Sequence, residues 1–160
     1  MKKNFKRIAL IIGAAFIVSQ FIRPDRTNPE SNPTKSMEAI QNVPVEISSI
    51  MDRACRDCHS NHTVWPWYSN IAPMSWLVVN DIVEGREHLN FSEWGNYKKG
   101  KMVKKLSQMA EEVTDNSMPL QKYTFLHSEA KLNKQERKLF SDWAEKEADQ
   151  MNVVSDDSTE

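Results

Sequence analysis

The chain has 160 residues, with 21 lysines and arginines against 22 aspartates and glutamates, so its formal net charge at pH 7 is −1. The charge is uneven: residues 1–26 hold six basic residues and one acidic residue, which leaves 15 basic and 21 acidic residues, a net charge of −6, for residues 27–160. This acidic balance argues against binding to nucleic acid, and the length of the soluble part predicts one domain.

The amino terminus has the pattern of an export signal. Four basic residues within the first seven precede an apolar run over residues 8–22, although this run is short for a spanning helix, which usually needs about 20 residues. Because residues 1–23 contain no clear small-x-small cleavage site, we expect an uncleaved anchor that holds the chain in the cytoplasmic membrane through residues 5–23. The domain then faces the periplasm. The alternative is a cleaved signal and a soluble periplasmic protein.

The next two segments are a tether and the first helix of the domain. Residues 24–43 are rich in proline, asparagine and serine and have few large apolar residues, which predicts a semi-extended tether. Pro44 suits the first turn of a helix, and apolar residues from Ile47 to Cys58 recur at the spacing of one helical face. We therefore expect a domain over residues 44–151 that begins with this helix.

The end of this helix carries a C-x-x-C-H motif, formed by Cys55, Cys58 and His59, with the only two cysteines of the chain. Two thiols at this spacing lie on one side of a helical turn and can both bond to one haem, while the adjacent histidine binds the iron. The motif predicts one covalently attached haem c. The alternatives are a redox-active thiol pair, although no βαβ pattern surrounds it, and a zinc site with His62, for which the ligand spacing is too short.

An aromatic cluster follows the motif. Broad aromatic side chains can cover a flat apolar porphyrin, so we expect Trp65, Trp67 and Tyr68 to contact the haem. A carbonyl near Pro66 is expected to accept the second ring N–H of His59. Two arginines, Arg53 and Arg56, are either partners of the haem propionates or solvated surface charges.

Two more helices are predicted in the middle of the chain. One begins near Pro73 and ends near His88, and the other carries an apolar stripe from Met102 to Val113. Lysines over residues 98–105 lie beside this second stripe, and they form either a docking patch for an acidic redox partner or a solvated face.

The second iron ligand is predicted in the loop after that helix. Met118 is followed by proline, and a thioether paired with His59 gives the His/Met ligation of electron-carrying cytochromes c. The alternative second ligands are another methionine, Met74, which lies close behind the attachment motif, and three histidines: His62, His88 and His127. Tyr123, in the same region, is expected near the haem edge.

The last helix begins with a capping box, because Asn133 is followed three residues later by Glu136, and its apolar residues from Leu139 to Ala144 share one face. We expect it to pack across the first helix of the domain. Residues 152–160 are polar and acidic, which predicts a disordered tail. No segment has the alternation typical of a strand, so the fold class is all-α.

Residues 55–76, with their C-x-x-C-H and W-P-W-Y stretches, and residues 117–127, with M-P-x-x-x-Y, resemble a haem-binding domain family of exported bacterial proteins related to c-type cytochromes. The resemblance covers roughly residues 40–148. It implies a small, mostly helical, cytochrome c-like domain with a single haem.

We therefore expect a membrane-anchored protein that transfers single electrons outside the cytoplasm to a redox partner that the sequence does not identify. Two protein ligands leave the iron no open position, so an enzyme is not expected. The alternative function is a haem-based sensor or ligand-binding module, or a weak peroxidase, in which the sixth ligand is labile or absent.

Overall fold

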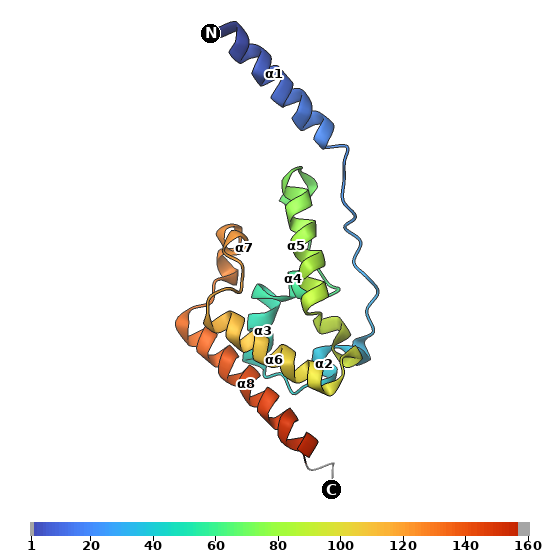
Figure 1. The fold of residues 1–160 in the computed structure, drawn as a ribbon, viewed down its shortest axis with the longest axis vertical. Coiled ribbons are helices and arrows are strands. Elements are labelled where there is room, and N and C mark those ends of the chain that lie inside the picture. The colour runs from blue at the N-terminus through green and yellow to red at the C-terminus, as the bar shows by residue number, and fades with distance from the viewer. Residues whose placement is uncertain (1, 157–160) are drawn as a thin grey trace.

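The structure, a computed structural model, describes residues 2–156, and this part of the chain contains helices and turns but no strand (Figure 1). The predicted all-α fold class is confirmed. The α-helices are α1 (Lys2–Ser19), α2 (Met37–Ile40), α3 (Val45–Ala54), α4 (Arg56–His59), α5 (Met74–His88), α6 (Lys99–Thr114), α7 (Gln121–Leu126) and α8 (Lys134–Asp156). The 3-10 helices are η1 (Pro33–Lys35), η2 (Trp67–Asn70), η3 (Phe91–Asn96) and η4 (Ser128–Ala130).

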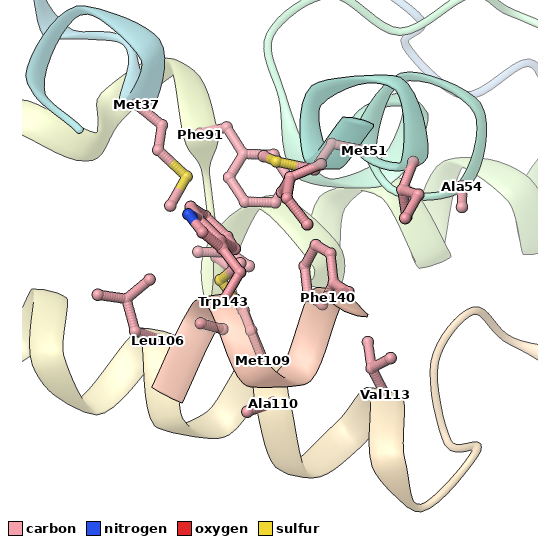
Figure 2. Close-up of a cluster of buried hydrophobic side chains, with 14 of the residues drawn as sticks. Met37, Met51, Ala54, Phe91, Leu106, Met109, Ala110, Val113, Phe140 and Trp143 are labelled. Atoms are coloured by element: carbon pink, nitrogen blue, oxygen red, sulfur yellow. The ribbon is translucent and has the colours of Figure 1, made fainter. Parts of the chain in front are cut away.

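The core lies where α6 and α8 pack along each other beneath α3 (Figure 2). Each helix contributes the apolar stripe that its sequence spacing predicts, and the largest side chains interdigitate, as close packing of an interior requires. Trp94 of η3 and Phe140 of α8 are almost fully buried, with 0% and 1% of their surface exposed. The sequence predicted that the last helix, α8, packs across the first helix of the domain, α3. The structure has this contact, but α8 packs mainly on α6.

The capping box at the start of α8 is confirmed. The Asn133 side-chain oxygen accepts the Glu136 backbone N–H at 3.0 Å, and the Glu136 carboxylate accepts the Asn133 backbone N–H at 2.8 Å. The helix continues to Asp156, so the prediction of a disordered tail is wrong for residues 152–156. Residues 157–160 lie outside the described part of the chain.

The predicted helix through the C-x-x-C-H motif is divided at Cys55. Its backbone leaves the helical region, with φ −128° and ψ −45°, so that Cys55 ends α3 and begins α4. The Cys55 carbonyl then accepts the N–H groups of Cys58 and His59, at 3.2 and 3.0 Å. Cys58 and His59 consequently lie on a separate helical turn, which sets their direction independently of α3.

The prediction of a tether over residues 24–43 is also wrong, because this segment packs against the domain. Met37 is fully buried in the core, with 0% of its surface exposed. Asn28 donates to the Thr63 carbonyl at 2.9 Å, and Asn61 donates to the Glu30 carbonyl at 3.0 Å. The polar composition that suggested a flexible segment supplies hydrogen bonds to the domain instead.

The amino-terminal helix α1 stands away from the core (Figure 1). Residues 5–23 were predicted as a membrane anchor. A search of the helices in residues 2–156 found none with both the length and the apolar character needed to cross a membrane.

Candidate functional site

A cavity of about 490 Å³ lies between α4, α5, α6 and the segment that joins α6 to α7. This volume is within the range of about 300–1,000 Å³ that is typical of ligand sites in proteins. Most of the cavity wall is apolar, which suits a flat apolar cofactor. The apolar lining residues are Ala54, Leu89, Phe91, Met109, Val113, Pro119, Leu120, Leu132 and Phe140.

Both cysteines of the motif line this cavity, and neither forms a disulfide. Burial in apolar surroundings raises the pKa of Cys55 and of Cys58 to about 12. Redox-active thiol pairs depend on a thiolate with a lowered pKa, and these thiols have the opposite property. The surroundings of Cys55 and Cys58 thus disfavour the alternative of a redox-active pair.

His59 is fixed in the orientation and tautomer that a metal ligand needs. Its Nδ1 lies 2.9 Å from the Gly85 carbonyl oxygen and 3.1 Å from the Leu89 carbonyl oxygen. Because a carbonyl only accepts, Nδ1 carries the proton and Nε2 keeps a free lone pair. Burial also lowers the pKa of His59, which favours the neutral imidazole. The partner carbonyls thus come from the last turn of α5 and from Leu89 directly after it, and the expectation of a carbonyl near Pro66 is wrong.

The close approach of α5 to the motif depends on a glycine. A Cβ atom added to Gly85 would lie 2.7 Å from the Cys58 carbonyl oxygen, a separation that real side chains do not tolerate. The absence of a side chain lets the Gly85 carbonyl reach His59 while the helix packs on Cys58.

Met118 lines the same cavity from the segment after α6. The chain turns there through Asn116, whose φ of 61° is in the left-handed region that asparagine tolerates better than most residues. The Ser117 and Met118 N–H groups both donate to the Glu112 carbonyl at 3.0 Å. The Arg137 guanidinium donates to the Met118 carbonyl at 2.8 Å, so three hydrogen bonds hold this segment in place.

The alternative histidine ligands are in less suitable positions. His127 lies outside the cavity wall, and both of its ring nitrogens are engaged, with the Tyr68 hydroxyl at 2.8 Å and the Glu129 carboxylate at 3.1 Å. His62 is exposed, lies outside this cavity and approaches the Ser31 hydroxyl. His88, the last residue of α5, does line the cavity, but it is exposed.

Of the four aromatic residues predicted to contact a haem, only Tyr123 lines the cavity. It stacks on His127 with ring centroids 4.3 Å apart, and its hydroxyl donates to Asp57 of the motif at 3.0 Å. Tyr68 is buried one layer behind, on His127, while Trp65 is half-buried and Trp67 is 74% exposed. The prediction that Trp65, Trp67 and Tyr68 cover the cofactor is therefore not supported, because none of them reaches the cavity.

Charged side chains also line the cavity. Lys122 of α7 pairs with Asp81 of α5 at 2.7 Å. Arg53 and Arg56 do not line it, since Arg53 pairs with Glu136 and Arg56 pairs with Glu38. Cations suit the carboxylates of a haem, and those in the wall are Lys105 and Lys122. Sequence analysis included Lys105 among the lysines of residues 98–105 but did not place it at the site, and it missed Lys122. It also missed the Gly85 and Leu89 carbonyls, because backbone oxygens leave no mark on a sequence.

The groups in the cavity fit a haem better than a bare metal ion. They comprise two protonated thiols, one imidazole with a free Nε2 and one thioether, within a mainly apolar wall. In residues 2–156, no group of three or more His, Cys, Asp or Glu side chains is arranged to hold a metal ion, which disfavours the zinc alternative with His62. Fold and cavity together define an all-helical domain with a haem-type site.

Comparison with protein families agrees with this class. The chain matches the family described as "Haem-binding domain" over residues 14–146, and it belongs to that family. The resemblance inferred from the sequence is thereby confirmed. Comparison with curated proteins and with solved structures found no match.

Proposed function

We propose that this protein binds one haem c covalently through Cys55 and Cys58, and that it transfers single electrons with His59 and Met118 as the iron ligands. A haem bound in this way supplies an iron that cycles between two oxidation states. Membership of the haem-binding family supports the cofactor, and the cavity supports the choice of residues.

The observation that carries the proposal is the state of His59 in a cavity that Met118 also lines. Two backbone carbonyls accept the Nδ1 proton, so Nε2 keeps a free lone pair. Nε2 can therefore bind iron without a change of tautomer. Met118 comes from a different wall of the same cavity and is held by its own hydrogen bonds. Two protein ligands favour an electron carrier over an enzyme, because an enzyme needs an open position at the metal.

We also propose that the protein works outside the cytoplasm. The basic start and apolar run of residues 1–23 support an export signal that keeps the domain at the membrane, with a cleaved signal as the alternative. The electron passes to or from a separate redox protein, and the lysines of residues 98–105 are the candidate docking patch.

Absorption spectra of the purified holoprotein and of Met118→Ala test the ligand assignment. We expect six-coordinate low-spin iron in the wild type, and high-spin iron that binds carbon monoxide in Met118→Ala. Met74→Ala is the matched control, because Met74 lies outside the cavity wall. An unchanged Met118→Ala spectrum would assign the ligand elsewhere, with His88 next to be tested. High-spin wild-type iron would favour the sensor or the weak peroxidase.

Acid-acetone extraction tests the covalent attachment separately. Protein produced with intact cytochrome maturation is expected to keep its red colour after extraction, whereas Cys55→Ser/Cys58→Ser protein is expected to lose it. Wild-type protein that folds without colour would contradict the proposed cofactor.

A further inference from the structure

The amino-terminal end of α5 carries an exposed apolar surface that the haem cavity does not use. Its large side chains are between 37% and 84% exposed, far more than those of the core. We call this surface the apolar tip, and it consists of Trp67, Ile71, Met74, Trp76, Leu77 and Phe125. Large apolar side chains that are exposed together at one end of a domain often mark an interaction site.

The apolar tip is formed mainly by a long stretch of sequence without charge. Residues 63–80 contain no lysine, arginine, aspartate or glutamate, although 27% of the whole chain is charged. Phe125 is added from α7, whose following residue His127 bonds to Tyr68 of the uncharged stretch at 2.8 Å. A surface that binds an acidic partner carries basic side chains, and one that binds a basic partner carries acidic side chains. Residues 63–80 have neither, so this stretch does not fit a charged protein partner.

Hydrogen bonds connect the apolar tip to the end of α1. Gln20 exchanges two hydrogen bonds with the Ala72 backbone, at 3.2 and 3.0 Å, and the Trp76 indole N–H donates to the Ile22 carbonyl at 2.8 Å. In Figure 1 the amino-terminal end of α5 points toward the end of α1. Leu10 of α1 and Phe21, two residues after its end, are also exposed apolar side chains, so the segment that bonds to the tip is itself apolar.

The composition of the combined surface fits lipid. Tryptophan is enriched where proteins meet the membrane-water interface, and Trp67 and Trp76 both belong to the tip. Arg23 is exposed at the junction with α1, where it can contact anionic headgroups. We propose that the apolar tip lies on the lipid bilayer that α1 contacts, so that the domain rests on the membrane in one orientation. This inference rests on the proposed location of the protein at a membrane.

Paramagnetic accessibility of a nitroxide label tests the contact in the full-length holoprotein. The label is placed at Leu77→Cys or Trp67→Cys in the tip, with Lys146→Cys as the matched control. Lys146 is exposed on the half of α8 that ends at the opposite end of the molecule from α1 (Figure 1). A chain without an introduced cysteine reports any labelling of Cys55 and Cys58.

With vesicles of phosphatidylethanolamine and phosphatidylglycerol, both tip labels are expected to be severalfold less accessible to a water-soluble nickel chelate than the Lys146→Cys label, and more accessible to oxygen. Tip labels as accessible to nickel as the control would overturn the proposal. Shielding from nickel and oxygen together would also overturn it, since a protein would then cover the tip.

The same sample separates this proposal from the proposed function. If the chain does not sediment with the vesicles, the membrane location fails and the tip contact fails with it. If the chain sediments while the tip labels stay in water, only the tip contact fails. The absorption spectrum reports the haem assignment independently of either result.

Discussion

At the scale of single residues, the site depends on how closely α5 approaches the C-x-x-C-H motif. The Gly85 carbonyl holds the Nδ1 proton of His59, and the missing side chain of Gly85 leaves room for the Cys58 backbone. Neither contact involves a side chain of α5, so the residue that orients the proposed iron ligand contributes only its backbone. A glycine that looks unremarkable in the sequence thus becomes a requirement of the site.

Replacing this glycine is predicted to destabilise the folded protein. In Gly85→Ala the added Cβ meets the Cys58 carbonyl oxygen at 2.7 Å, so α5 has to move. Such overpacking costs about 1–3 kcal/mol, measurable by chemical denaturation of the holoprotein. Gly100→Ala is the matched control, since a Cβ there has no atom within 4 Å and alanine favours a helix. Equal stability of the two variants would show that α5 adjusts freely.

At the scale of elements, α8 supports the segment that carries Met118. Arg137 donates from α8 to the Val113 carbonyl at 2.9 Å and to the Met118 carbonyl at 2.8 Å. It therefore joins the end of α6, the Met118 segment and α8 across the core. The capping box of Asn133 and Glu136 fixes where α8 begins, and so where Arg137 stands.

Removing this arginine is predicted to loosen Met118 while the domain stays folded. Arg137→Ala removes the guanidinium donor from the Met118 and Val113 carbonyls, of which Val113 keeps the Asn116 N–H at 3.3 Å. Hydrogen bonds of a charged group contribute about 1.5–3 kcal/mol, and less for a half-buried group such as this one. We expect the reduced holoprotein to bind carbon monoxide severalfold faster. Lys138→Ala, on the same helix but paired with Asp142, should behave as the wild type. Unchanged binding in Arg137→Ala would mean that the Glu112 carbonyl alone holds the segment.

At the scale of the whole molecule, the cavity and the core are continuous. Met109, Val113 and Phe140 belong to the buried cluster and also line the cavity, so the wall of the site is the edge of the core (Figure 2). This cavity of about 490 Å³ leaves apolar side chains of the core edge without a neighbouring protein surface, and a bound cofactor would cover them. The proposed cofactor is thus expected to contribute to folding as well as to function.

Protein made without haem is predicted to lose stable tertiary packing. We expect Cys55→Ser/Cys58→Ser protein from cells without cytochrome maturation to keep helical circular dichroism, to lose near-ultraviolet circular dichroism and to bind a hydrophobic dye. Holoprotein should unfold cooperatively at a higher temperature. The same double variant loaded non-covalently with haem is the control. If it regains near-ultraviolet circular dichroism and cooperative unfolding, the loss of packing comes from the missing haem and not from the serines. Cooperative unfolding of the haem-free protein at an unchanged temperature would contradict this expectation.

The sequence by itself determined the features that depend on local spacing. The stripe of α6 and the capping box of α8 are each set by residues within a few positions of one another, and the structure has both where they were expected. Met118 and Tyr123, in the segment that the proline after Met118 and the family resemblance marked, both line the cavity.

Only the tertiary structure decided what depends on contacts between distant segments. The carbonyls that hold His59 come from residues 26 and 30 positions later, and a backbone oxygen is the same for every residue type. The helix break at Cys55, the burial of Met37 and the positions of Trp65, Trp67 and Tyr68 outside the cavity wall are likewise visible only in the folded chain. Hydrophobic burial is non-directional, so a sequence shows that a side chain prefers to be covered but not which surface covers it.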